Sequence, residues 1–193
     1  SLFWQMQLDT ITPREVGNRL KSVLETDRAA GASPRVFAHV FPFSTHNYEL
    51  RYWLAGCGID PDRDLNLSVV PPPQMVKSLR EGSIDGFCVG APWSEVAQAD
   101  GTGRVVVRKY QIWNNSPEKV LGVTHSWAHQ NPNTHLALIA ALIETARWLD
   151  RTENRAEAAR IVVESHALEA PPEVVHEALQ ARSSGHPLGR GLV

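Results

Sequence analysis

The sequence has 193 residues, enough for one large domain or one and a half small ones. It is 42% hydrophobic and 21% charged, an ordinary globular composition, and its formal net charge of −2 gives no sign of a nucleic-acid-binding surface. No apolar run approaches the roughly 20 residues of a membrane-spanning helix, and the two cysteines, Cys57 and Cys88, indicate buried thiols rather than a disulfide framework.

The first half of the sequence alternates predicted helices and strands. A capping box with proline at the first helical position, Thr12-Pro13-Arg14-Glu15, predicts a helix that stops near Gly31. The β-branched and aromatic run at 35–40 predicts a strand, and a helix with an aromatic face follows it. Further along, strands are expected at 65–70 and 84–90, with a short helix at 74–80 and another opening at Ala91-Pro92-Trp93.

The second half is predicted to be mainly helical. Two more strands are expected first, at 104–108 and 118–123. A long helix then starts at Asn133 or Thr134, followed by helices at 154–165 and 171–182 and a glycine-rich tail. The apolar residues of the long helix recur at helical spacing and are expected to face inward: Leu136, Ile139, Leu142, Ile143, Ala146 and Leu149.

This order of elements predicts an α/β fold with a mixed, mostly parallel sheet flanked by helices. Open sheets of this class bind ligands beyond the carboxyl ends of their strands. The stretch from Phe41 to Trp53 follows such an end, and Ser44 or Thr45 is expected to cap its helix. A helix start presents amide groups and a partial positive charge, which suit an anion. His46 can join those amide groups, or it can be a loop histidine that hydrogen-bonds to solvent.

Two further places suggest the same chemistry. Gly90 follows a strand and lets a backbone N–H approach a ligand closely. Lys119 is a cation that a loop brings next to a predicted strand edge, and the alternative is an ordinary surface lysine. Together these residues predict a small-anion pocket without metal or cofactor, and no CxxC or HExxH motif contradicts that. An enzyme that pairs Cys88 with His46 is disfavoured, because Cys88 lies in an apolar strand whereas a reactive thiol needs an exposed, electropositive site.

Six groups of motif residues follow one another along the sequence. They are Phe41-Pro42 with His46-Asn47 and Leu50-Arg51-Tyr52-Trp53, Gly58-Ile59-Asp60-Pro61-Asp62, Val70-Pro71-Pro72-Pro73-Gln74-Met75-Val76, Asp85-Gly86-Phe87-Cys88-Val89-Gly90-Ala91-Pro92-Trp93, Pro117-Glu118-Lys119-Val120-Leu121-Gly122 and Asn131-Pro132-Asn133. In this order they resemble the nitrate/nitrite-binding proteins of ABC transporters and their cytoplasmic sensor relatives, from about Ser1 to Leu179. The resemblance implies a type II periplasmic-binding-protein fold, with two α/β lobes and a ligand cleft between them.

The resemblance also implies the anion contacts. They fall on His46, Gly90 and Lys119, with a glutamine upstream that is Gln5 or, as the alternative, Gln7. Similar bicarbonate-binding proteins carry a carboxylate at the lysine position and use calcium. Lys119 therefore points to nitrate or nitrite without metal, and both of these planar monoanions fit.

The resemblance further implies a division of the chain into lobes. Residues 1–125 are expected to form the second, ligand-binding lobe, 126–182 C-terminal helices that pack on or return to the first lobe, and 183–193 a flexible tail. The opening strands of the first lobe are expected to be missing from this sequence. The chain alone should therefore bind its anion weakly or not at all.

The run Phe43-Ser44-Thr45-His46-Asn47-Tyr48 is similar to the NasS-type sensors. That similarity implies a cytoplasmic nitrate/nitrite sensor whose partner is a transcription antiterminator of nitrate assimilation. The alternative is the extracytoplasmic substrate-binding component of an ABC nitrate/nitrite transporter, with a permease as partner. No enzymatic activity, direct nucleic-acid binding or membrane insertion is expected, and no signal peptide is visible in a chain that opens on Ser1.

Overall fold

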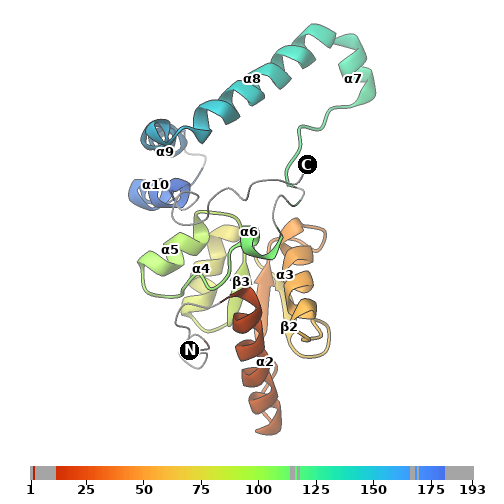
Figure 1. Ribbon diagram of the computed structural model, residues 1–193, viewed down its shortest axis with the longest axis vertical. Helices are drawn as coiled ribbons and strands as arrows, with labels where there is room; N and C mark the ends of the chain where they lie inside the picture. The colour runs from red at the N-terminus through yellow and green to blue at the C-terminus, as the bar shows by residue number, and fades with distance from the viewer. Residues whose placement is uncertain are drawn as a thin grey trace. The chain divides into compact units, whose positions relative to one another are not determined.

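The computed structural model describes residues 2, 12–113, 116, 118–165, 168 and 170–180 (Figure 1). The chain divides into two compact units, residues 1–117 and 118–193. The expected lobe boundary after residue 125 stays a prediction. Among the described helices, none is both long and apolar enough to cross a membrane.

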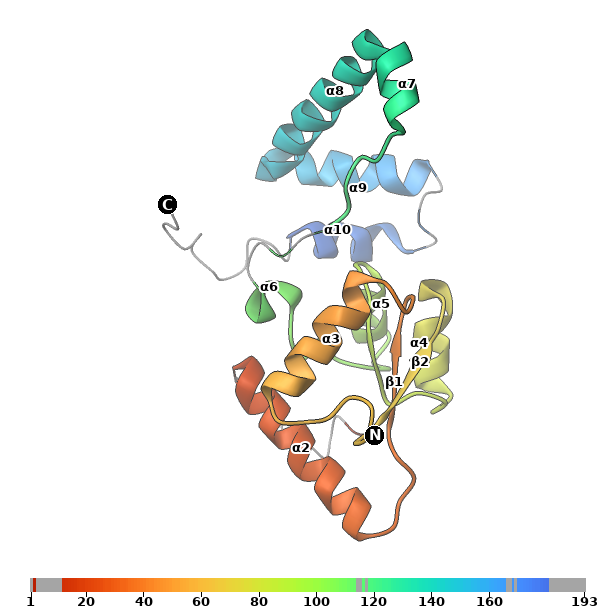
Figure 2. The same cartoon turned by 90° about the vertical axis from the view of Figure 1, so that its right-hand side faces the viewer.

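The first unit is an α/β layer around a parallel sheet. Its elements are α2 (Pro13–Ala29), β1 (Val36–His39), α3 (Thr45–Gly56), β2 (Asn66–Val69), α4 (Pro72–Arg80), β3 (Gly86–Cys88), α5 (Trp93–Ala99) and α6 (Lys109–Ile112). The strand order is β2-β1-β3, and both pairs are parallel, with Phe37 opposite Leu67 on one side and Gly86 on the other. The predicted α/β class with a parallel sheet is confirmed. Figure 2 shows α2 and α3 on one face of the sheet and α4 on the other.

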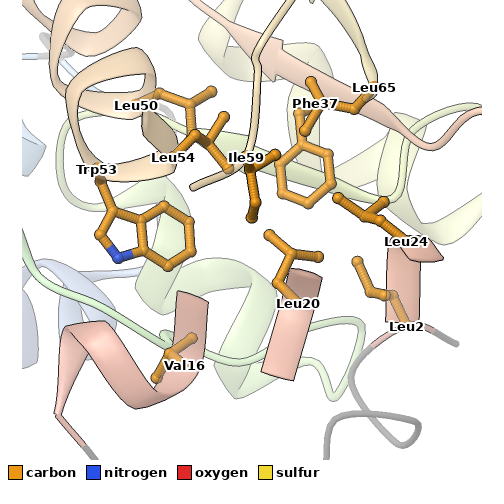
Figure 3. Packing of buried hydrophobic residues seen from close by; sticks show 10 residues of the cluster. All are labelled: Leu2, Val16, Leu20, Leu24, Phe37, Leu50, Trp53, Leu54, Ile59 and Leu65. Atoms are coloured by element: carbon orange, nitrogen blue, oxygen red, sulfur yellow. The ribbon is translucent and has the colours of Figure 1, made fainter. Parts of the chain in front are cut away.

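The main core lies between the sheet and the helix pair α2 and α3 (Figure 3). Leu20 of α2 and Leu54 of α3 are fully buried there against Phe37 of the central strand. Fully burying a side chain of this kind contributes about 1.5–3 kcal/mol. The ring of Trp53 is buried beside them, and its Nε1 donates a hydrogen bond to the carbonyl oxygen of Pro13 at 2.9 Å. This core holds α3 in place, and α3 carries one of the predicted anion contacts.

Local sequence signals set where α2 and α3 begin. The Thr12 side chain accepts from the Glu15 amide while the Glu15 carboxylate accepts from the Thr12 amide at 2.8 Å, so the predicted capping box is confirmed. Ser44, the first of the two expected caps, is the N-cap of α3 and accepts from the Asn47 amide at 3.3 Å. Both helices therefore start where a side-chain oxygen satisfies an otherwise free N–H group.

Two predicted strands do not form. Residues 104–108 and 118–123 are described, and they have no regular secondary structure. The Val105 amide donates to the side-chain oxygen of Gln98 at 3.3 Å, and the side chain of Val120 is 87% exposed. A strand needs a neighbouring strand for its backbone hydrogen bonds, and within the described ranges neither segment has one. The prediction of strands at 104–108 and 118–123 is therefore wrong.

The second unit is helical. It contains α7 (His125–Gln130), α8 (Pro132–Asp150), a 3₁₀ turn η1 (Thr152–Asn154), α9 (Arg155–Glu164) and α10 (Pro172–Gln180). Its buried side chains lie where α9 meets α10, and include Ala158, Ala159, Val174 and Val175. The expectation that the apolar residues of α8 face inward is wrong here: Leu136, Ile139, Leu142 and Ile143 are between 37% and 68% exposed. Helix α8 contacts α7, η1 and α9, its neighbours along the chain.

Candidate functional site

The carboxyl ends of the strands bring His46 and Gly90 together. Strand β1 leads through a short loop into α3, whose first turn holds His46, while Gly90 follows β3 by two residues. A Cβ atom placed on Gly90 would lie 3.6 Å from Nε2 of His46. Because β1 and β3 are parallel neighbours, their ends meet at one edge of the sheet. We refer to this place, defined by His46 and Gly90, as the anion edge.

Hydrogen bonds fix the loop that positions His46. The Ser44 hydroxyl donates to the Phe41 carbonyl oxygen at 2.7 Å, and the Asn47 side-chain amide donates to the Pro42 carbonyl oxygen at 2.7 Å. These bonds hold the chain as it enters α3 and therefore hold the first helical turn. That turn carries the positive end of the helix dipole, worth about 0.3–1 kcal/mol to a nearby anion.

Gly90 leaves space in front of the imidazole. Its backbone is not in the left-handed region that favours glycine, and a Cβ at 3.6 Å from the ring would make only an ordinary contact. The fold itself therefore accepts a side chain at this position. Because Gly90 has no side chain, there is space between its backbone and Nε2 of His46.

A second imidazole lies close to this edge and was missed by the sequence reasoning. His39 is the last residue of the central strand and is only 5% exposed. Burial lowers the pKa of His39, a backbone hydrogen bond with Phe41 opposes that shift, and the charge of Arg51 adds to it. The lowered pKa favours the neutral form of the ring. The signal that could have found it is its place at the end of a strand, directly before the Phe41–Ser44 loop.

Two carboxylates of the first unit are buried, one on α3 and one on α5. Glu49 of α3 has its Oε1 3.2 Å from Nζ of Lys109 and accepts from the Ser116 hydroxyl at 3.0 Å. Glu95 of α5 has its Oε1 3.0 Å from a guanidinium nitrogen of Arg108. Sequence reasoning missed both pairs, because burial of an acid depends on contacts between distant segments.

The thiol of Cys88 is unsuited to nucleophilic chemistry. Burial raises the pKa of Cys88 to about 12, Glu49 adds to the rise, and the charge of Lys109 opposes it. A nucleophilic cysteine needs a lowered pKa, because the thiolate is the reactive form. The pairing of Cys88 with His46 as nucleophile and base therefore has no electrostatic support.

The remaining predicted contacts belong to other parts of the sequence. Lys119 belongs to the second unit, is 79% exposed, and its Nζ lies 2.9 Å from a carboxylate oxygen of Glu118. Lys119 was expected next to a strand edge, but residues 118–123 form no strand. The part of Lys119 in anion binding stays a prediction. Gln5 and the alternative Gln7 lie outside the described residues. Among the residues that are described, no group of three or more His, Cys, Asp or Glu side chains could hold a metal ion.

Curated and solved proteins match most of this chain. A nitrate import ATP-binding protein NrtC from Synechocystis is 50% identical over 118 residues, which is 61% of this chain and 18% of that protein. A bicarbonate transport ATP-binding protein CmpC from Synechococcus elongatus is 40% identical over 148 residues, 77% of this chain and 22% of that protein. The chain therefore spans about a fifth of the length of these two relatives.

One solved structure that matches is the periplasmic nitrate-binding protein NrtA from Synechocystis PCC 6803. It superposes with a TM-score of 0.77 at 31% identity, over 88% of this chain and 42% of the solved chain. This match confirms the expected type II periplasmic-binding-protein fold. It covers less than half of the solved protein, so the chain corresponds to one part of that fold.

Two of these relatives are named as import or transport ATP-binding proteins, and the third is named as a periplasmic nitrate-binding protein. None of the three is named as a cytoplasmic sensor, and the solved protein is named as periplasmic. The expected cytoplasmic location and antiterminator partner therefore gain no support, and the transporter alternative does. A model of the NMT1-like family matches residues 3–163, well over half of the sequence. The chain belongs to the NMT1-like family.

Proposed function

We propose that this chain is part of a nitrate- or nitrite-binding protein that serves as the substrate-binding component of an ABC transporter. The observation that carries the proposal is the convergence of His46 and Gly90 at the start of α3, in a fold shared with a nitrate-binding protein. Sensor function and enzymatic activity are not part of the proposal, because no described contact favours either.

The chemistry of the anion edge suits a small planar monoanion. An imidazole N–H and a backbone N–H can each donate to an anion oxygen, and hydrogen bonds to charged groups contribute about 1.5–3 kcal/mol each. The start of α3 adds a favourable partial charge. Two or three such contacts, after the entropy of association is subtracted, support affinity of roughly micromolar order.

Lys119 is proposed as the cation of the complete site, with Gln5 as a further donor. A charged group buried without a partner is unfavourable, so an anion enclosed between two lobes needs a cation nearby. A lysine in this role favours nitrate or nitrite over a metal-dependent ligand, because its ammonium repels a divalent cation.

The exposed face of α8 is proposed to pack on the remaining lobe of the complete protein. Eight consecutive residues, 136–143, are apolar, so this part of the helix is hydrophobic on every side. A helix of that kind is normally buried, and an exposed apolar patch marks an interaction surface. This supports the assignment of residues 126–182 to helices that return to the first lobe.

Titration calorimetry of nitrate and nitrite, with bicarbonate and sulfate as comparisons, tests the proposed function. We expect micromolar binding of nitrate or nitrite by the complete protein that carries this sequence, and much weaker binding by the 193-residue chain. His46→Ala should weaken the binding without changing the melting temperature. Preference for bicarbonate, or affinity that ignores His46→Ala, would contradict the proposal.

A further inference from the structure

A buried carboxylate lies on the helix that carries His46. Glu49 follows His46 by three residues on α3, and residues at this spacing lie on the same side of a helix, about 5–6 Å apart. Glu49 is only 5% exposed, and its charge acts on Cys88, which precedes Gly90 by two residues in the chain. Glu49 is therefore a near neighbour of His46 on α3, and its charge reaches Cys88, two residues before Gly90.

Lys109 and Ser116 satisfy this carboxylate. The ammonium of Lys109 lies 3.2 Å from Oε1 of Glu49, and the Ser116 hydroxyl donates to the same oxygen at 3.0 Å. Lys109 opens α6, a short helix that contacts α3. The ion pair therefore brings a positive charge from a distant segment to the one buried acid of α3.

An unneutralised carboxylate in this place would repel an anion. Helix spacing and a strand rise of 3.3 Å per residue put Glu49 roughly 10 Å from an ion at the anion edge. At that distance and an effective dielectric constant near 20, one full charge changes anion affinity by about tenfold. Lys109 cancels most of that repulsion, because it sits on the same carboxylate.

We propose that Lys109 is a charge-compensating residue of the anion edge, which neutralises Glu49 so that a nitrate or nitrite ion can bind beside His46 and Gly90. This inference rests on the proposed function. Lys109 acts through Glu49 and positions charge; it is not itself placed against the ion. The balance of charge at this pair, and not only its contribution to folding, then sets anion affinity.

Two opposite substitutions in the complete protein test this role by nitrate and nitrite calorimetry. Glu49→Gln keeps the shape of the side chain and an oxygen for Ser116, leaves Lys109 positive, and should tighten binding severalfold. Lys109→Met leaves the buried carboxylate bare and should weaken binding about tenfold. The double variant should return to within about threefold of wild type. Lys77→Met, which removes an exposed lysine paired with Glu81 on α4, is the control and should leave affinity unchanged.

The signs of the two effects separate charge compensation from a purely structural role. A structural ion pair predicts that both single variants weaken binding, and that result overturns the inference. Unchanged affinity in Glu49→Gln also overturns it, and this variant keeps the test valid if Lys109→Met does not fold. If the wild-type protein binds neither nitrate nor nitrite, the proposed function fails and this inference with it. If the wild-type protein binds nitrate or nitrite but Glu49→Gln and Lys109→Met do not change the affinity in the expected directions, this inference fails and the proposed function stands.

Discussion

Gly90→Ala is expected to separate anion binding from folding at the anion edge. The added Cβ would lie 3.6 Å from Nε2 of His46, an ordinary contact, and the backbone at Gly90 needs no left-handed conformation. The free energy of unfolding should therefore change by less than about 0.5 kcal/mol, as at most positions without a special contact.

Anion affinity should nevertheless fall. An anion oxygen that accepts from the imidazole must lie about 2.7–3.2 Å from Nε2, and a methyl carbon 3.6 Å from Nε2 would crowd an oxygen that lies between the ring and Gly90. Losing one hydrogen bond to a charged group removes about 1.5–3 kcal/mol, which is roughly a 10-fold to 150-fold loss of affinity. Nitrate calorimetry on the complete protein measures the affinity, and thermal unfolding of the same samples measures the stability.

Two other glycines serve as controls for this experiment. Gly56, the last residue of α3, has nothing within 4 Å of an added Cβ, so Gly56→Ala should leave affinity unchanged. Gly86→Ala would bring a Cβ within 2.8 Å of the Phe37 ring and should destabilise the fold. Wild-type affinity in Gly90→Ala would refute the reasoning, because the space beside His46 would then not be the binding space. A drop in melting temperature as large as that of Gly86→Ala would also refute it.

Three further predictions follow from single residues. Lys119→Ala should weaken nitrate binding by about 2–5 kcal/mol, or roughly 30-fold to several-thousand-fold, and should leave the melting temperature unchanged because the side chain is exposed. If calorimetry finds wild-type nitrate affinity in this variant, Lys119 is an ordinary surface lysine. Trp53→Ala should lower the free energy of unfolding in a denaturant titration by about 3–5 kcal/mol, because it leaves a cavity in the core and removes the hydrogen bond to the Pro13 carbonyl. A loss below about 1 kcal/mol would contradict the described packing of Trp53. Because burial lowers the pKa of His39 below its ordinary 6.5, the unfolded chain binds a proton that the folded chain does not. Stability should therefore fall as the pH drops through about 6.5 toward the folded-state pKa, and His39→Gln should flatten that part of the pH profile.

Local interactions explain which parts of the fold were predictable from sequence. The capping box at Thr12 and the N-cap at Ser44 depend on residues three apart, and both occur as expected. The segments 104–108 and 118–123 have strand-like composition, but a strand also needs a partner edge, which composition cannot supply. The periodic apolar residues of α8 likewise predict a helix correctly without saying what covers it.

The same distinction applies to the site. The convergence of His46 and Gly90 follows from a general property of parallel sheets, so two strand ends in the sequence were enough to predict it. Glu49 carries no such signal, because its burial depends on α6. His39 ends the strand before the Phe41–Ser44 loop, so its place was readable from the sequence, but its burial was not. Lys119 was chosen through the family resemblance, and its role remains a prediction.

The anion edge is tested most directly by a nitrate titration followed by two-dimensional ¹H–¹⁵N NMR on the complete protein, with the Gly90 amide and the His46 ring nitrogens assigned. We expect both signals to shift together and to saturate at the affinity measured by calorimetry, while the amide signal of Gly56 at the far end of α3 stays in place. Saturable nitrate binding that leaves the Gly90 and His46 signals unmoved would contradict the claim that the anion edge is the binding site.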